Sequence, residues 1–246
     1  MADHIQIPQV WMRNFMHKSG DGEKVYCCIC KNGTVSEEKI SDLGAEDNYY
    51  IPDFEKYLSK NWEMKFGEIN KKIRKGIKSG VFRFELTENE CDFLKRFLTL
   101  SIGRSKTFQV NLLQQHNSNF PFIGIREIAP LSVLSEKPMF NDYNIQFLFN
   151  RTNVGFVLPS YSYYYIHQQN FDSPIMVLTD KIAIRFIKKE KSEDFNKMVN
   201  CSVLMLDNEE NIKNYNYYAV LAELGTNNDF IIAKNKNDLE ILINGG

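Results

Sequence analysis

The sequence predicts an α+β fold, and three observations lead to this prediction. Apolar residues recur at helical spacing up to about residue 138, they alternate with polar residues beyond it, and a short strand-turn-strand pattern precedes both parts. Hydrophobic residues make up 43% of the 246 residues, which is enough for a sizeable core. No linker-like tract interrupts the chain. We therefore expect one α+β domain over 1–246, in which a helix-rich part (1–138) and a strand-rich part (139–246) share one core.

The first expected element is a β-hairpin near the N-terminus. Lys24 to Cys30 alternates as a strand does, Asn32-Gly33 supplies the residues of a tight turn, and Thr34 to Ile40 can return as the partner strand. This small hairpin precedes the helical part.

Two longer helices follow. From Pro52 the apolar positions step by three and four, which predicts one long amphipathic helix. Its apolar stripe consists of Leu58, Trp62, Phe66, Ile69, Ile73 and Ile77. Thr87 and Glu90 form a capping-box sequence, and we expect a second helix from there to about Gly103. The segment 106–138 predicts one or two short helices.

The strand-rich part begins after Pro138, where the apolar period becomes two. The expected strands are 143–150, 154–158, 163–167, 175–178, 181–188, 203–206 and 230–233. Asp207 or Asn208 can cap a helix that ends near Gly225. Short turns between successive strands favour a mostly antiparallel sheet.

Composition excludes several classes of function. The net charge is −1, so any nucleic-acid binding must come from a local patch rather than from the field of the whole molecule. No apolar run is long enough for a transmembrane helix, and we expect no membrane association. The five cysteines are an odd number and no signal peptide is evident, which favours free thiols and a cytoplasmic location. Nucleotide-loop, hydrolase and metalloprotease motifs are absent from the sequence.

Three clustered cysteines, Cys27, Cys28 and Cys30, raise the question of a metal site. Structural zinc needs a second Cys/His pair at a defined spacing, and none follows in the sequence. Alternation along a strand also sends Cys27 to the face opposite Cys28 and Cys30. We therefore expect no metal and no other cofactor.

The opening segment places His4, Arg13 and Asn14 among large apolar residues that should be buried. Histidine titrates near neutral pH and arginine binds phosphate through two parallel hydrogen bonds, so this group could form an acid-base or phosphate site. The structural alternative is that Arg13 pairs with a helix carboxylate such as Glu55 or Glu63 and fastens the segment to the core.

The long helix offers further candidates. Glu55 and Glu63 fall near the edges of the face that carries Trp62, where an aromatic wall can raise the proton affinity of a carboxylate. Glu68 is expected to pair with Lys72 in solvent. The basic run 71–78 could hold a phosphate backbone, but a solvated helix face is the favoured interpretation. The tyrosines around 161–165, next to His167, could contact a ligand, although alternating core and surface positions are commoner.

The segment from His4 to Phe15 resembles the opening of a bacterial family, the domain of unknown function 4238 family. Further blocks of the chain resemble the family in the same order. They are 24–40, 44–50, Glu55 to Glu63, Ile102 to Ser105, 175–180, 214–219 and 230–234. The resemblance implies a bacterial or phage-borne protein and brings no established activity.

Two positions depart from the family pattern. Members usually carry a histidine three residues before the proline, where this chain has Ile5, and its nearby histidine is His4. Members also tend to carry an aspartate soon after the strand that matches Gly155 to Leu158, where this chain has Pro159-Ser160-Tyr161. A family mechanism that needs either group would have to be rebuilt here.

Two hypotheses for function follow. In the first, His4, Arg13, Asn14, Glu63 and Arg104 form a polar ligand or nucleic-acid site, and phosphodiesterase chemistry is the reaction such a site would serve. In the second, these residues are structural and the aromatic C-terminal half is a noncatalytic protein-interaction module. An RNA, a nucleotide and a protein are the partners that these hypotheses allow. A site requires an open cleft, whereas a module requires closed salt bridges and an exposed aromatic patch.

Overall fold

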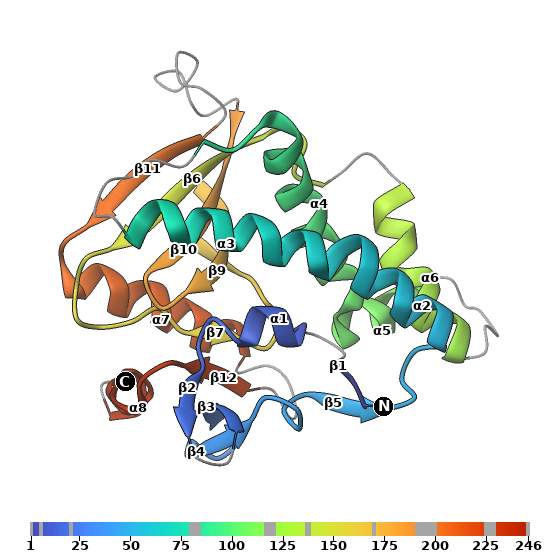
Figure 1. Cartoon of the computed structure of the whole chain (residues 1–246), viewed down its shortest axis with the longest axis horizontal. Coiled ribbons are helices and arrows are strands. Elements are labelled where there is room, and N and C mark those ends of the chain that lie inside the picture. Colours follow the sequence, from blue (N-terminus) through green and yellow to red (C-terminus); the bar gives the residue numbers. More distant parts are fainter. Residues whose placement is uncertain are drawn as a thin grey trace. The chain divides into compact units, whose positions relative to one another are not determined.

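A computed structural model describes residues 2–4, 7–19, 22–78, 85–115, 122–135, 139–168, 171–189, 201–223 and 230–244 (Figure 1). The chain divides into two compact units. The first consists of Met1–Val10 and Ala45–Asp142, and the second of Trp11–Gly44 and Tyr143–Gly246. The predicted α+β class is confirmed, because helices dominate the first unit and sheets the second. The single shared core stays a prediction.

The first unit opens with a two-stranded sheet that the sequence did not predict. Strand β1 (Ala2–His4) pairs antiparallel with β5 (Ala45–Asp47), and His4 lies opposite Ala45. Both strands have only three residues, too few to show an alternating pattern. The pairing brings the N-terminus beside the segment that leads into the long helix.

The predicted long helix is confirmed, with one irregularity. It consists of α2 (Pro52–Leu58), the π-helical turn η1 (Ser59–Glu63) and α3 (Met64–Lys78). Pro52 stands at the helix start, where a missing N–H costs nothing. Leu58, Phe66 and Ile73 are buried, as the stripe predicts, while Trp62 in the π turn is half-buried. The Ile77 side chain and Gly80 lie outside the described part.

The second predicted helix, α4 (Glu88–Arg104), begins at a complete capping box. Thr87 Oγ1 accepts a hydrogen bond from Glu90 N at 3.2 Å, and Thr87 N donates to Glu90 Oε2 at 2.7 Å. The Phe97 ring stacks on Phe66 of α3 with centroids 4.2 Å apart, which packs the two helices together. The expected short helices are α5 (Lys106–Gln115) and α6 (Phe122–Ser135).

The second unit contains a five-stranded sheet. Its order is β11 (Cys201–Leu206), β6 (Tyr143–Asn150), β10 (Ile182–Lys188), β9 (Phe171–Thr179) and β8 (Tyr164–Gln168). All neighbours are antiparallel except β11 and β6, which are parallel, so the expected mostly antiparallel sheet is confirmed. The strand expected over 154–158 is wrong, since only β7 (Leu158–Pro159) forms a strand there.

A second sheet joins the two ends of the sequence. Its order is β2 (His17–Ser19), β3 (Gly22–Ile29), β12 (Phe230–Ala233) and β7, and β4 (Thr34–Lys39) pairs with β3. The predicted hairpin is therefore confirmed as β3 and β4, but it belongs to the strand-rich unit rather than to the helices. Local sequence patterns do not indicate the pairing of β3 with β12, because these two strands are far apart in the sequence.

Three helices complete the second unit. They are α1 (Gln9–Met12), whose last two residues lie in this unit, α7 (Glu209–Glu223) and α8 (Lys236–Asn244). The helix expected after Asp207 is confirmed as α7, whereas α1 and α8 were not predicted. Trp11, Met12 and Phe15 are buried, and Trp11 Nε1 donates to Val177 O at 2.7 Å. None of the described helices is both long and apolar enough to cross a membrane.

Candidate functional site

The five predicted site residues are distributed over both units. Glu63 and Arg104 belong to the first unit, as does His4, whose side chain lies outside the described part. Arg13 and Asn14 belong to the second unit. The structure brings Glu63 and Arg104 into contact.

Arg13 forms an ion pair within the second unit. Its Nε lies 2.7 Å from Glu23 Oε2 on β3. The two side chains are 45% and 48% exposed, so the ion pair contributes on the order of 0–1 kcal/mol. This carboxylate comes from the neighbouring hairpin, and the expected pairing of Arg13 with Glu55 or Glu63 stays a prediction.

His17 is a titratable residue of the same segment that sequence reasoning missed. Its Nε2 lies 2.6 Å from Glu37 Oε1, and Lys24 Nζ lies 3.0 Å from Glu37 Oε2. The ring stacks on Tyr26 with centroids 4.4 Å apart. Hydrogen bonds from His17 and Lys24 lower the pKa of Glu37. The alternation of charged residues along the hairpin was the sequence signal that could have indicated this group.

Arg104 and Glu63 form a deeply buried ion pair. Arg104 Nη1 lies 3.0 Å from Glu63 Oε1, and the two side chains are 2% and 17% exposed. Arg104 is the last residue of α4, where a positive charge is favoured by the helix dipole. Burial alone would lower the pKa of Arg104, but Tyr50 and Glu63 beside it raise it. The guanidinium therefore stays charged.

The π turn of the long helix carries the carboxylate of this pair. Glu63 is the last residue of η1, and Trp62 precedes it. The Trp62 ring stacks on Phe93 with centroids 5.5 Å apart, and no described group accepts a hydrogen bond from its buried Nε1. Such π turns are irregularities that recur at functional sites. Helical periodicity cannot predict one, so the sequence placed Glu63 only at the edge of the apolar face.

Two arginines of the first unit lie against tyrosine rings. The Arg104 guanidinium lies 5.7 Å from the Tyr50 ring centroid, and the Arg126 guanidinium lies 4.2 Å from that of Tyr49. These contacts are within cation–π range. We call Tyr49, Tyr50, Glu63, Arg104 and Arg126 the Arg104 cluster. Arg126 lies on α6, in a segment where the sequence gave no site residue.

Hydrogen bonds fix the position of Tyr49 within the Arg104 cluster. Its hydroxyl donates to Gln109 Oε1 at 2.7 Å, and Gln109 Nε2 donates to Arg104 O at 3.3 Å. Arg126 Nη1 donates to Tyr49 O at 3.2 Å. Burial raises the pKa of Tyr49, so the phenol stays protonated at neutral pH.

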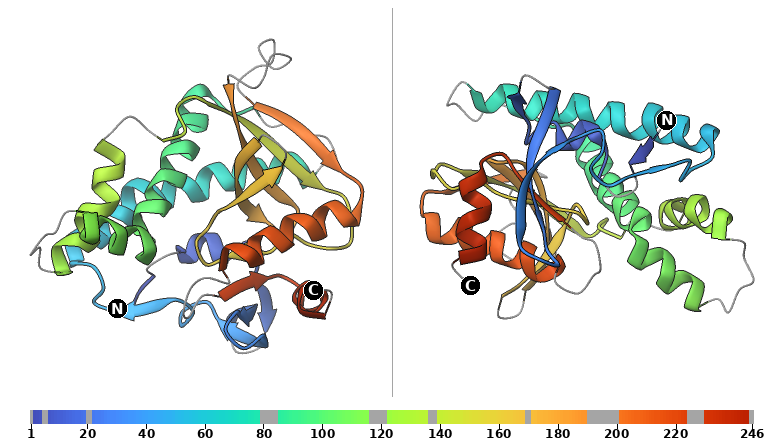
Figure 2. Two further views of the ribbon diagram at one scale, coloured as in Figure 1. Left: turned by 180° about the vertical axis from the view of Figure 1, so that it is seen from behind. Right: turned by 90° about the horizontal axis from the view of Figure 1, so that it is seen from below.

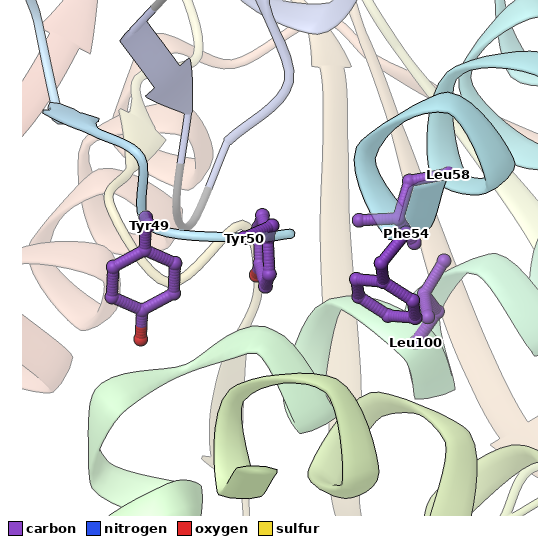
Figure 3. Close-up of a cluster of buried hydrophobic side chains, with 5 residues drawn as sticks. All are labelled: Tyr49, Tyr50, Phe54, Leu58 and Leu100. Atoms are coloured by element: carbon purple, nitrogen blue, oxygen red, sulfur yellow. The ribbon is translucent and has the colours of Figure 1, made fainter. Parts of the chain in front are cut away.

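The apolar side of the Arg104 cluster is a small packed core. Tyr49 and Tyr50 extend to the same side of the segment before α2, and Phe54, Leu58 and Leu100 lie next to Tyr50 (Figure 3). Tyr49 and Tyr50 meet edge to face, with centroids 4.8 Å apart. Glu55 also lies close enough for its charge to act on Tyr50 and Arg104. The Arg104 guanidinium thus lies among aromatic rings and near a second carboxylate, that of Glu55.

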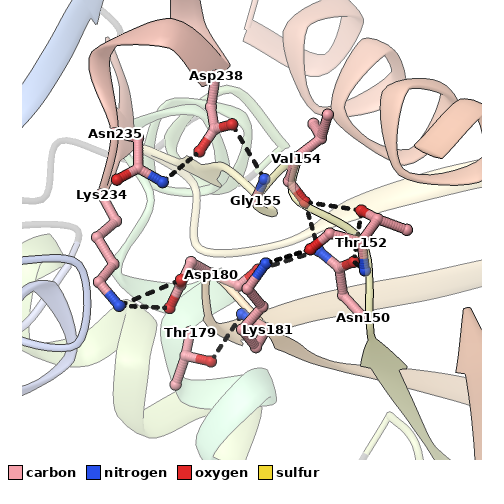
Figure 4. Close-up of polar contacts among 10 residues, drawn as sticks. All are labelled: Asn150, Thr152, Val154, Gly155, Thr179, Asp180, Lys181, Lys234, Asn235 and Asp238. Carbon is pink, nitrogen blue, oxygen red and sulfur yellow. Dashed lines mark hydrogen bonds and ion pairs between the residues drawn. The ribbon is translucent and has the colours of Figure 1, made fainter. Parts of the chain in front are cut away.

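The second unit has its own polar network at the ends of its strands (Figure 4). Lys234 Nζ lies 3.2 Å from Asp180 Oδ2, and Gly155 N donates to Asp238 Oδ1 at 3.0 Å. Asn150 Nδ2 donates to Val154 O at 2.6 Å. Because these bonds satisfy buried backbone and carboxylate groups, the network fastens strand ends to the start of α8.

A buried carboxylate contacts the turn Pro159-Ser160-Tyr161, where the resemblance led us to expect an aspartate. Glu223 of α7 accepts hydrogen bonds from Ser160 Oγ at 2.8 Å and from Tyr161 N at 3.1 Å. Both Glu223 and Ser160 are fully buried. The carboxylate thus comes from a distant helix, which no local sequence pattern could indicate.

The other sequence predictions have mixed outcomes. Lys72 pairs with Glu90 at 2.8 Å, so the expected pair with Glu68 is wrong. Lys71, Lys72, Arg74 and Lys75 are exposed, as a solvated helix face requires.

Tyr164 is buried while its neighbours are partly exposed, which confirms the alternation, and the His167 side chain lies outside the described part. Cys27, Cys28 and Cys91 are buried free thiols, and Cys30 is half-buried.

Comparison with protein-family models places the first half of the chain beside a known family. Residues 4–121 match the model of a family described as "Protein of unknown function (DUF4238)". The chain resembles this family. The matched segment contains four residues of the Arg104 cluster, and Arg126 lies just beyond it. No curated protein and no solved structure matches the chain.

Proposed function

We propose that the Arg104 cluster binds a phosphate-bearing ligand, namely a nucleotide or a single-stranded RNA. The observation that carries the proposal is the pair of arginines, each held against the face of a tyrosine in one cluster. A guanidinium presents a rigid fork of donors that matches phosphate oxygens, and stacking on an aromatic ring fixes its plane. Among the five predicted residues the proposal rests on Glu63 and Arg104; His4, Arg13 and Asn14 stay predictions.

Ligand binding would exchange one partner of Arg104 for another. Glu63 is the more exposed member of its pair, so it can turn away while a phosphate oxygen takes its place on Arg104. The exchange keeps the buried guanidinium neutralised, which avoids the cost of an unpaired buried charge.

A hydrolytic step is the finer part of the proposal. The released Glu63 carboxylate could take a proton from a water molecule as the water oxygen attacks phosphorus and the phosphorus–oxygen bond to the leaving alcohol breaks. The leaving oxygen takes up a proton from solvent. Arg104 would stabilise the charge that develops on the phosphate oxygens. This is the phosphodiesterase chemistry that the first hypothesis names.

A noncatalytic protein-interaction module is the second candidate function. It is favoured by the closed ion pairs of Arg13 and Arg104, and by the exposed Tyr217 and Leu221 on α7. These two side chains are one helical turn apart and form an apolar strip that a partner could cover. A bacterial or phage origin and a cytoplasmic location are compatible with both candidates and stay proposals.

Native mass spectrometry of the gently purified protein separates the two candidates. We would compare the wild type with Arg126→Gln, which removes the guanidinium of the less buried arginine. Arg151→Gln is the matched control, because Arg151 is an exposed arginine that pairs with Asp207 in the second unit. Circular dichroism verifies that each variant is folded.

The proposed function predicts a copurifying nucleotide or RNA that is present in the wild type and in Arg151→Gln and absent from Arg126→Gln. Retention of the ligand by Arg126→Gln would move the site away from the cluster. A wild type that carries only a protein partner would contradict ligand binding and favour the module.

A further inference from the structure

A row of residues crosses the five-stranded sheet of the second unit at one level. Arg185 on β10 lies opposite Ile175 on β9, and Tyr164 on β8 lies opposite the same Ile175. On the other side, Arg185 lies opposite Gln146 on β6. Residues that are directly opposite in a sheet point to the same face. Gln146, Arg185 and Tyr164 therefore share one face, and Ile175 is the apolar residue between the last two.

Helix α7 packs against this sheet. It contacts β8 and β11, which are the two edge strands of the sheet, and it lies beside the strands in both views of Figure 2. Tyr215 of α7 lies close enough to interact electrostatically with both Tyr164 and Arg185. The Tyr215 ring meets Phe156 edge to face, with centroids 5.8 Å apart. The helix thus adds a second phenol to the row.

Two polar atoms in this row lack the partners that buried polar atoms usually have. The Tyr164 side chain is 1% exposed, and no described group is within hydrogen-bond distance of its hydroxyl. The Nε atom of Arg185 is likewise buried without a partner, and the described residues provide no carboxylate for its guanidinium. A buried hydroxyl without a hydrogen bond costs roughly 1–3 kcal/mol. Within the described ranges, Arg185 also has no carboxylate that forms an ion pair with it.

We propose that Arg185, Tyr164 and Tyr215 form a binding site for the phosphate group of a small molecule, between α7 and the sheet. The guanidinium supplies up to five N–H donors and the two phenols supply one O–H donor each. A carboxylate has about four acceptor positions on two oxygens, whereas a phosphate group has three or four oxygens and can accept from more of these donors at once. The bound anion would satisfy the Tyr164 hydroxyl and neutralise Arg185 together.

Access and protonation are compatible with this site. Arg185 and Tyr215 are partly exposed, so an anion can approach from solvent while Tyr164 forms the closed end. Burial raises the pKa of both tyrosines, so both remain protonated donors at neutral pH. The site lies entirely in the second unit and is independent of the Arg104 cluster.

Tyr164→Phe is the sharpest variant for the test. It removes only the hydroxyl, and because that hydroxyl has no partner among the described residues, the variant should fold at least as stably as the wild type. Arg185→Gln removes the charge and keeps part of the side-chain length. Arg151→Gln is the control, since it removes an exposed arginine of the same unit.

The probe is inorganic phosphate, added to each full-length protein at constant ionic strength with chloride as the reference anion. Binding is measured by isothermal titration calorimetry and by the rise in Tm that a native-state ligand produces. We expect binding to the wild type and to Arg151→Gln, an affinity about tenfold lower for Tyr164→Phe, and no binding to Arg185→Gln. Equal binding by all four proteins, or no binding by the wild type, overturns the proposal.

Discussion

Arg104 Nη1 lies 3.0 Å from Glu63 Oε1, although 41 residues separate them in the sequence. The contact joins the last residue of α4 to the last residue of the π turn. It therefore links the end of one helix to the irregular turn of another. A guanidinium this deeply buried must keep a negative partner. The stability of the helical unit should therefore be sensitive to the loss of either member of this pair.

Removing one member of this pair should destabilise the fold unequally. Arg104→Met leaves Glu63 partly exposed and should cost roughly 1–3 kcal/mol, mostly from lost hydrogen bonds. Glu63→Ala leaves the buried guanidinium without its carboxylate and should cost roughly 3–5 kcal/mol. Urea denaturation of both variants and of the double variant gives the coupling energy. Additive effects of the two substitutions would show that the ion pair is not coupled.

The capping box of α4 gives a local prediction. Thr87→Ala removes the hydroxyl that accepts a hydrogen bond from Glu90 N, and it should lower the free energy of unfolding by about 1 kcal/mol. Thr87→Ser retains a hydroxyl at the same place and should remain within a few tenths of a kcal/mol of the wild type. Denaturant titration of the three proteins tests this, and an equal loss in both variants would argue against capping.

Glu90 should make stability depend on pH in the acid range. Partial burial raises its pKa, but hydrogen bonds from Lys72 and Thr87 outweigh burial and lower it. The stabilising contribution is thus fully present above the unfolded-state pKa of about 4.3, and it is lost as the pH falls through the folded-state value. The stability difference between the wild type and Glu90→Gln should shrink from about pH 5 downward. A constant difference across this range would refute the assignment.

Gly155 should not accept a side chain. A Cβ atom at this position would lie 2.7 Å from Asp238 Oδ2 and 3.3 Å from Asp180 Cβ, inside the polar network that Figure 4 draws. Gly155→Ala should therefore destabilise the protein by roughly 1–3 kcal/mol. Gly124→Ala on α6 is the control, since its nearest neighbour would be 3.8 Å away and alanine favours a helix. Thermal unfolding that ranks the two variants in the opposite order would contradict this account.

Local sequence patterns predicted the elements whose cause is local. The apolar spacing from Leu58 to Ile73 indicated the long helix, and Thr87 with Glu90 marked the start of α4. Asn32-Gly33 indicated the hairpin turn, where Gly33 adopts a φ of 64°. These signals depend on residues a few positions apart, which is the range over which side chains act on their own helix or turn.

The candidate sites depended on contacts that local patterns do not reveal. Glu63 and Arg104 were both selected from the sequence, but neither their pairing nor the π turn follows from periodicity. Arg126 was missed because it sits in a segment without a clear period. Similarly, the strand pairings that align Arg185 with Tyr164 through Ile175 exist only in the assembled sheet. Sequence reasoning supplied residue types, and tertiary structure supplied their neighbours.

The central claim is that the Arg104 cluster binds a phosphate-bearing ligand, and fluorescence anisotropy with a labelled single-stranded RNA tests it most directly. Nucleoside monophosphates serve as competitors, and the wild type is compared with Arg126→Gln. We expect saturable binding by the wild type, release by a monophosphate competitor, and an affinity at least tenfold lower for Arg126→Gln. Absence of binding to the RNA and to the monophosphates, or equal affinity of the two proteins, would contradict the claim.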